Sequence, residues 1–491
     1  MNIGSKIKEL TIQGKVPSRR FIWLGILAIL VLHLVLAINS PNYKGLQKRE
    51  LTSGFVHHFG QHFFYYFYYQ NQFPVASLEK EKDFSKEGAQ KFADSNGESL
   101  IMEYKHWSRM GENARIFAYL PDAWVRGSAA KPTMKLFNTL LFVIGLISIF
   151  IGLSRIGYPL LAIILVLLFS FTPFYLYEVY HNKNIFGLLA SVFLLIVGMN
   201  IRFLYYKRSK IAYLLIPIIT GLIIGFFTEI RGEIKVLLLS ATLLYFFASK
   251  LQFITKVGLI ILLIASSIGM QKTIRHYFDI KFEKATVFVK EHGGHVYTGP
   301  RMGAHSFWHP VYCGLGDFDS KYGYKWDDIV AYRYGLDMMQ KEYAIDLAYS
   351  GKYGLDEYYD QDSLYYKKLE EFDEYDQIVK AKVLHDIRND KAWYANIILK
   401  RFERILNRTL PFSGSGWLIF PVFILLLMAK EWRFIYLLIA SLPLSLTPLI
   451  IFAKGNATFN STFPMLCLAI ILMWIATYFY RQYAKPNSSN S

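Results

Sequence analysis

Long apolar stretches recur along most of this 491-residue chain, and they constrain its fold more than any other feature. A helix needs about 20 apolar residues to cross the hydrocarbon core of a bilayer. Two of the stretches are short for a full crossing, so the sequence predicts about ten transmembrane helices, within a range of nine to eleven. The ten stretches are Phe21–Ile38, Leu136–Leu153, Tyr158–Leu176, Ile185–Ile201, Ala212–Phe227, Val236–Ala248, Val257–Met270, Trp417–Met428, Phe434–Phe452 and Phe463–Tyr480.

Composition excludes the main alternatives to a mainly α-helical polytopic membrane protein. Hydrophobic residues make up 53% of the chain and charged residues 19%, which a soluble protein could hardly bury. The chain has 54 Lys and Arg residues against 37 Asp and Glu residues, a net charge of +17. Much of this excess flanks the apolar stretches, where it indicates topology and contact with lipid headgroups rather than nucleic-acid binding. The sequence therefore predicts membrane lipids as partners and no nucleic acid.

Basic residues alternate with the apolar stretches in the way that the positive-inside rule requires. A basic N-terminus, four basic connections and a basic tail all fall on one side when ten helices are threaded in order. The sequence therefore predicts a multi-pass protein of a bacterial inner (plasma) membrane with both termini in the cytoplasm. The residues concerned are Lys6, Lys8, Lys15, Arg19, Arg20, Arg155, Lys207, Arg208, Lys210, Lys250, Lys256, Lys430, Arg433, Arg481 and Lys485.

Two long segments then face the outside, residues 39–135 and residues 271–415. They divide the chain into an N-terminal transmembrane module (1–270), an extracytoplasmic domain (271–415) and C-terminal helices with a tail (416–491). The apolar stretches hold almost no ionisable residues, whereas a pump or channel more often places such groups within its spans. Polar chemistry gathered on the external face favours an enzyme that works at the membrane–water boundary.

The first external segment carries two candidate catalytic acids, Glu103 and Glu112. They lie in residues 97–115, where carboxylates, a histidine and two arginines stand among apolar residues. A carboxylate that is partly shielded from water and close to a cation can act as a general base. Surface salt bridges explain either residue alone about equally well.

A charged turn interrupts two apolar helices at residues 228–233. It holds Glu229, Arg231 and Glu233, which are costly to place at a membrane boundary. The planar guanidinium of Arg231 could bind phosphate oxygens, with the two acids completing a substrate-binding site. The alternative is that Arg231 only neutralises the two acids.

Residues 299–319 form the densest group of functional side chains in the second external segment. Repeated Gly and Pro predict a shaped loop rather than a helix. Aromatic rings stack on sugar faces while polar groups hold hydroxyls, so sugar binding is one interpretation. A divalent cation is another, although no metal-motif spacing is met and no metal ligand is assigned; an ordered loop without a ligand is a third. The candidate substrate-binding residues here are Arg301, His305, Trp308, His309 and Asp317, and the cation alternative would use His305, His309, Asp317 and Asp319.

Two further features of the external segments and spans have structural interpretations. Residues 337–407 are rich in Tyr and show helical spacing of apolar residues, which predicts a helical subdomain that serves as scaffold. Cys313 falls in an external segment and Cys467 in the last apolar stretch, so no disulfide between them is expected.

Four features together resemble the GT-C superfamily of polytopic glycosyltransferases, which includes the protein O-mannosyltransferases and the aminoarabinose transferases of lipid A. One apolar span is followed at once by a long external loop with aromatic and acidic residues. Residues 174–189 are similar to the junction between the third and fourth spans of such enzymes. Residues 229–233 resemble the family's Arg-Pro-Glu turn, with Gly232 where Pro is usual, and a mixed external domain precedes the last spans.

The resemblance covers roughly the first 270 residues and implies a reaction. A polyprenyl-phosphate sugar would serve as donor, and a glycan, glycolipid or protein hydroxyl as acceptor. An external carboxylate would deprotonate that hydroxyl, which attacks the anomeric carbon with inversion, while a cation such as Arg231 stabilises the departing phosphate. Family members place a catalytic acid early in the first loop, whereas here Glu50 stands alone and Glu103 and Glu112 lie late. No nucleotide cofactor is implied, and a divalent cation stays open.

Two other classes remain as alternatives. An O-antigen polymerase or ligase would act on the same lipid carriers but would use a lipid-linked oligosaccharide. A non-catalytic transporter or assembly protein is the third class, although a transporter would more often show inverted repeats or ionisable groups at the membrane midplane.

Overall fold

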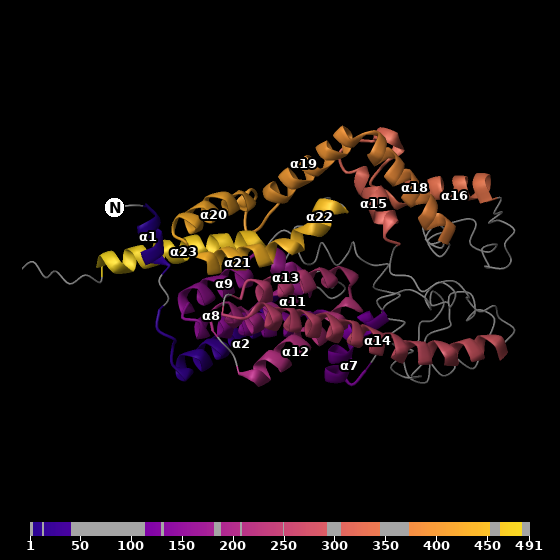
Figure 1. Cartoon of the computed structure of the whole chain (residues 1–491). Helices are drawn as coiled ribbons and strands as arrows, with labels where there is room; N and C mark the ends of the chain where they lie inside the picture. The colour runs from indigo at the N-terminus through magenta and orange to yellow at the C-terminus, as the bar shows by residue number, and fades with distance from the viewer. Residues whose placement is uncertain are drawn as a thin grey trace, which may run out of the picture.

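The computed structural model (Figure 1) describes residues 3–11, 14–40, 113–128, 132–180, 188–206, 209–248, 250–291, 306–343, 373–451 and 462–483. Helices dominate these residues, and no β-strand occurs among them. The prediction of a mainly α-helical membrane protein is confirmed at that level. One large hydrophobic core unites the apolar helices, and a second, smaller core lies in the external helices.

Each predicted apolar stretch is mainly helical in its described part, and Thr172 interrupts the third stretch between α9 (Pro159–Phe171) and α10 (Pro173–Val179). Among the described residues, six helices are long and apolar enough to cross a membrane, and three shorter apolar helices accompany them. The helices that hold the apolar stretches are α2 (Arg19–Asn39), α8 (Lys135–Arg155), α9 (Pro159–Phe171), α10 (Pro173–Val179), α11 (Leu188–Asn200), α12 (Lys210–Thr228), α13 (Leu237–Phe246), α14 (Phe253–Glu291), α20 (Ile419–Met428), α21 (Trp432–Ser441), α22 (Leu446–Ile450) and α23 (Thr462–Tyr483).

Glycines let two pairs of these helices approach closely. α12 and α14 run parallel and meet at Gly221 and Gly225, which are one turn apart. A Cβ atom on Gly225 would lie 2.4 Å from the carbonyl oxygen of Ser267. Small residues four positions apart allow this kind of backbone contact in membrane helices, where packing rather than the hydrophobic effect drives association. α8 and α11 pack in the same way, with Gly152 against Gly198.

Helix α14 is longer than the sequence predicts. The apolar stretch ends at Met270, but the helix continues to Glu291 and extends past the other helices of the bundle (Figure 1). Ile274 and Phe278 are buried on its continuation. The segment that is predicted to be external therefore begins as a helix that continues past the bundle.

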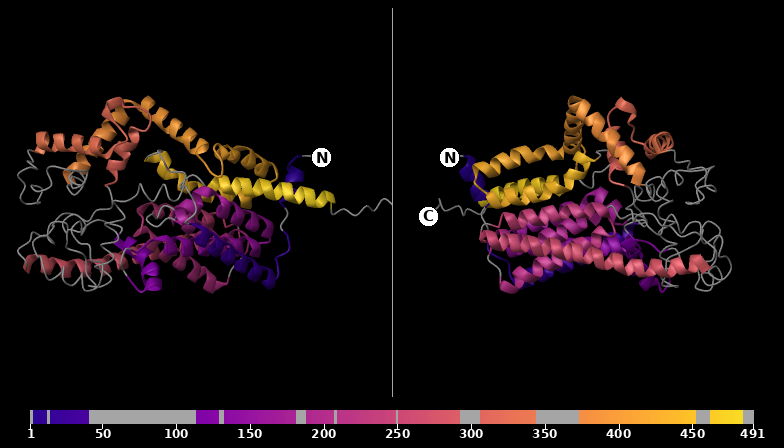
Figure 2. Two further views of the ribbon diagram at one scale, coloured as in Figure 1. Left: turned by 180° about the vertical axis from the view of Figure 1, so that it is seen from behind. Right: turned by 45° about the vertical axis from the view of Figure 1, so that its right-hand side comes forward.

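The described chain ends lie together at the end of the bundle opposite the external helices (Figure 2). The short helix α1 (Ile3–Leu10) contacts α23, where Arg481 forms an ion pair with Glu9. The indole of Trp474 also donates a hydrogen bond to the hydroxyl of Thr11.

Four described helices lie in the segment that is predicted to be external, and they are called the external helices below: α15 (Trp308–Leu315), α16 (Asp328–Tyr343), α18 (Asp373–Asn389) and α19 (Lys391–Asn407). They share the second hydrophobic core, which confirms the helical subdomain for the described part of residues 337–407. The prediction of a non-helical loop over residues 299–319 is wrong for α15. Pro310 lies in the first turn of α15, where the missing N–H is not needed for an intrahelical bond.

Candidate functional site

The charged turn at residues 228–233 connects α12 to α13 through the short 3₁₀ helix η4 (Gly232–Val236). The chain leaves α12 with the amide of Arg231 donating to the carbonyl of Phe227 at 2.9 Å. Arg231 itself is extended, and Ile230 and Ile234 on either side are fully buried. Burial of these two isoleucines therefore holds the backbone of the turn, which positions Arg231 and Glu233 between them.

Two ion pairs join the charged side chains of the turn to each other and to α14. A guanidinium nitrogen of Arg231 lies 3.0 Å from Oε1 of Glu233. Nε of Arg275 on α14 donates a hydrogen bond to Oε1 of Glu229 at 2.9 Å, and Nη2 of Arg275 lies 2.9 Å from the same oxygen. The Glu229 side chain is 4% exposed and that of Arg275 is 50% exposed, so this pair links the protein interior to the surface.

The end of the first external segment lies against the same turn. Its described part begins with the 3₁₀ helix η2 (Asn113–Tyr119) and continues into α7 (Leu120–Arg126). Arg115 of η2 donates from Nε to the carbonyl of Ile230 at 3.4 Å. The ring of Phe117 contacts the rings of Phe226 and Phe278, which belong to α12 and α14. Three elements far apart in the sequence thus meet here.

Arginine charge dominates the electrostatics of the turn. Burial alone would raise the pKa of Glu233, but the adjacent Arg231 and the nearby Arg115 outweigh it, so the pKa of Glu233 lies below its ordinary value. Three arginines stand beside two carboxylates in this group. Buried or half-buried guanidinium groups hold their charge and present forked donors, which suits an anion with several oxygens such as a phosphate.

The candidate residues in the external helices have different surroundings. His309 on α15 is buried, with Nδ1 2.6 Å from the hydroxyl of Tyr375 and Nε2 3.2 Å from Oδ1 of Asp328. Trp308 is half-buried, and Nζ of Lys380 lies 5.9 Å from the centre of its ring. Neither residue is close in sequence to the charged turn.

The side chain of Asp317 is fully buried in an ion-pair network within the external helices. Its Oδ2 lies 3.3 Å from Nε of Arg401, and its Oδ1 lies 3.8 Å from Nη1 of Arg404. Arg401 also donates to the backbone carbonyls of Leu449 and Ile450 at the end of α22. These contacts make Asp317 part of the junction between the external helices and the membrane bundle.

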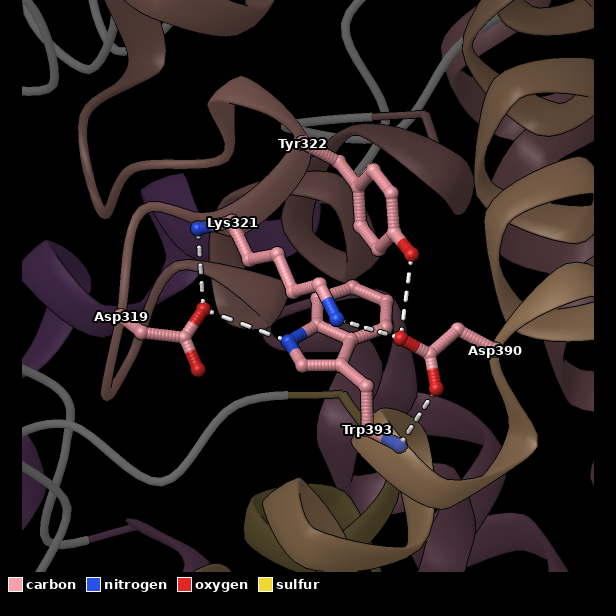
Figure 3. Close-up of polar contacts among 5 residues, drawn as sticks. All are labelled: Asp319, Lys321, Tyr322, Asp390 and Trp393. Atoms are coloured by element: carbon pink, nitrogen blue, oxygen red, sulfur yellow. Dashed lines mark hydrogen bonds and ion pairs between the residues drawn. The ribbon is translucent and has the colours of Figure 1, made fainter.

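A polar cluster on the external helices fixes the start of α19 (Figure 3). Asp390 accepts hydrogen bonds from the amide of Trp393 and from the hydroxyl of Tyr322, both at 3.0 Å, and pairs with Lys321. Asp319 accepts from the indole of Trp393 at 3.2 Å. Asp390 is therefore the N-cap of α19, and its partners hold the preceding loop against the helix.

Four predicted site residues lie outside the described residues: Glu103, Glu112, Arg301 and His305. The structure brings Glu229, Arg231 and Glu233 together, as their spacing in the sequence implies. It adds Arg115 and Arg275, which sequence reasoning did not assign to the site. A signal for Arg275 was present, since it is a lone arginine just after an apolar stretch and at the same end of the bundle as the turn.

Comparisons with protein-family models, with curated proteins and with solved structures found no match for this chain.

Proposed function

We propose that this protein is a membrane glycosyltransferase that moves a sugar from a polyprenyl-phosphate donor to an acceptor on the extracytoplasmic face, with inversion. The observation that carries the proposal is the group of three arginines at the charged turn. Arg231, Arg275 and Arg115 converge at one end of a bundle of apolar helices, beside two partly or fully buried carboxylates. A lipid phosphate needs such a position, with cations at the boundary and apolar helix surfaces below for its hydrocarbon chain.

The proposed roles follow from the chemistry of the groups. Arg231 stabilises the negative charge that develops on the departing lipid phosphate, and Glu233 orients its guanidinium. Arg275 is half-exposed and held by Glu229, so it can contact a ligand at the surface of the turn. Glu103 and Glu112 remain the proposed candidates for the general base, and the half-buried Trp308 is the proposed contact of the acceptor sugar.

Sugar transfer by the purified full-length protein, with a labelled polyprenyl-phosphate sugar in lipid vesicles, tests the proposal. Removal of one preorganised donor to a developing negative charge costs about 10²–10³-fold in kcat. We expect a loss of that size for Arg231→Ala and a partial loss for Arg231→Lys, since the ammonium keeps the charge but not the fork. Arg126→Ala is the control, because Arg126 is an exposed arginine that pairs with Asp122 on α7.

A double variant separates a catalytic role of Arg231 from a structural one. Arg231→Ala leaves the carboxylate of Glu233 without this partner and should lower thermal stability. Arg231→Ala/Glu233→Gln removes both charges and should restore much of the stability while transfer stays low. Recovery of transfer along with stability would show that Arg231 only neutralises Glu233. Transfer from a lipid-linked oligosaccharide alone would instead indicate a polymerase or ligase.

The acids are tested in the same assay. Loss of a general base costs about 10²–10⁴-fold in rate. We expect Glu103→Gln to lose that much and Glu112→Gln far less, since an apolar run of Leu, Ile and Met precedes Glu103 in the sequence, whereas Gly and Asn flank Glu112. Near-normal transfer by both variants would exclude the pair.

A further inference from the structure

An imidazole, a thiol and a carboxylate meet where α15 approaches the start of α16. His309 and Cys313 are one turn apart on α15, and Asp328 is the first residue of α16. Nε2 of His309 lies 3.2 Å from Oδ1 of Asp328, and Sγ of Cys313 lies 3.8 Å from each of these two atoms. These residues are a minimal set of nitrogen, sulfur and oxygen donors on two different helices.

The three distances fit the edges of a tetrahedral zinc site. Zinc binds imidazole nitrogen at about 2.0–2.1 Å, thiolate at about 2.3 Å and carboxylate oxygen at about 2.0–2.2 Å. Tetrahedral angles then place neighbouring donor atoms about 3.4–3.6 Å apart. The distances in this protein depart from those values by about 0.2–0.3 Å, so small side-chain movements would close the site around an ion.

The histidine is oriented in the way that metal-binding histidines usually are. Its second ring nitrogen, Nδ1, lies 2.6 Å from the hydroxyl of the fully buried Tyr375. Its ring also stacks on that of Tyr332, with centroids 4.4 Å apart. A proton on Nδ1 donated to Tyr375 leaves the lone pair of Nε2 directed at Cys313 and Asp328. Such outer hydrogen bonds fix the tautomer and ring plane of metal ligands.

Solvent can reach the group from one side. The side chains of His309 and Cys313 are almost fully buried, whereas that of Asp328 is 62% exposed. A metal ion could therefore enter past Asp328 and bind against a preformed pair of buried donors. Three protein ligands would leave a fourth position directed toward solvent.

We propose that His309, Cys313 and Asp328 form a zinc-binding site that joins α15 to α16. The mixture of thiolate, imidazole and carboxylate selects a borderline-soft cation such as zinc over magnesium or calcium, which prefer oxygen ligands alone. Because the site spans two helices of the external hydrophobic core, bound zinc stabilises their packing. The site is separate from the charged turn, and its existence does not depend on the proposed glycosyltransferase activity.

Zinc content of the full-length protein tests the proposal. The protein is purified in detergent without a histidine tag, stripped with a chelator, equilibrated with zinc, dialysed and measured by atomic emission. We expect about one zinc ion per chain in the wild type and in Cys467→Ser, which changes the buried cysteine of the last apolar helix. We expect none in Cys313→Ala or Asp328→Asn. Tyr375→Phe should weaken zinc binding about 10–100-fold without abolishing it.

Cobalt provides a second measurement that identifies the sulfur ligand. A cobalt-loaded protein should show a thiolate-to-cobalt charge-transfer band in the near ultraviolet in the wild type and in Cys467→Ser, and none in Cys313→Ala. Asp328→Asn keeps the test decisive if Cys313→Ala fails to fold, because Asp328 is an exposed side chain. Zinc content equal to that of the wild type in Asp328→Asn, or no zinc in the equilibrated wild type, would overturn the proposal.

Discussion

Replacement of Gly225 by alanine should weaken the contact between α12 and α14 and reduce the stability of the membrane bundle. The added Cβ would lie 2.4 Å from the carbonyl oxygen of Ser267 and 2.9 Å from Cβ of Met270. The first of these atoms belongs to a helix backbone and cannot turn away, so the helices must separate locally by about 1 Å. Overpacking of this kind costs about 1–3 kcal/mol.

A matched glycine on the same helix pair isolates the effect. Gly269 of α14 has no atom near its virtual Cβ, so Gly269→Ala gains helix propensity, about 1 kcal/mol, without a clash. The difference in free energy of unfolding between the two alanine variants, measured in detergent with increasing denaturant, should be about 1–3 kcal/mol. Gly221→Ala/Gly225→Ala should cost less than the sum of its single variants, since one separation of the helices relieves both clashes. Equal stability of Gly225→Ala and Gly269→Ala would refute the close approach of these helices.

Three further predictions concern the external helices and the orientation of the chain. Arg401→Met should lower the free energy of unfolding by about 3–5 kcal/mol, because it leaves the carboxylate of Asp317 buried without this cation. Arg401→Met/Asp317→Asn should recover a large part of that loss, and thermal unfolding of the two variants measures the recovery. Hydrogen bonds from Lys321, from the amide of Trp393 and from Tyr322 lower the pKa of Asp390 to about 2. The ionised Asp390 therefore stabilises the fold above its unfolded pKa of about 3.9, and this stabilisation disappears as the pH falls through about 2. The thermal midpoint of the wild type should thus fall more steeply between about pH 4 and pH 2 than that of Asp390→Asn, which keeps a helix cap; parallel curves would contradict the ion pair. The orientation can be tested with an impermeant maleimide added outside intact cells, in a chain without its two natural cysteines. Asn389→Cys should react and Ser209→Cys should not; the reverse pattern would invert the proposed orientation.

The apolar stretches predict the helices of the bundle well, since burial in lipid requires continuous apolar sequence and internal backbone hydrogen bonds. Hydropathy does not predict the end of α14, because it falls after Met270 while the helix continues to Glu291. Helix continuation depends on backbone propensity instead, and residues 271–291 contain neither Gly nor Pro. Ile274 and Phe278 also keep helical spacing there, so the sequence does hold a signal for the longer helix.

The error at α15 has a different cause. Gly314 and Gly316 suggest a loop, but Gly314 lies in the helix and serves a close approach. A Cβ on Gly314 would lie 1.9 Å from the carbonyl oxygen of Ile451. A glycine that is needed for contact and one that ends a helix have the same appearance in a single sequence. Tertiary contact decides between them.

Pairing partners were the least predictable part of the candidate sites. Glu229 and Arg275 are 46 positions apart, and Asp317 and Arg401 are farther apart still. Cys313 and Asp328 belong to different helices, so their spacing matches no metal motif. Local pattern identifies which residues carry charge or donor atoms, whereas the packing of helices determines which of them meet.

Arg401 shows how one such partner places the external helices over the bundle. A helix leaves its last carbonyl groups without intrahelical partners, and this is costly at an apolar boundary. At the end of α22, Arg401 supplies the missing donors to Leu449 and Ile450 while its Nε faces Asp317. A lysine could not make these contacts at once, because they need a fork of donors in a plane. The same side chain thus donates hydrogen bonds to the last carbonyl groups of α22 and neutralises the buried carboxylate of Asp317, which joins the external helices to the bundle.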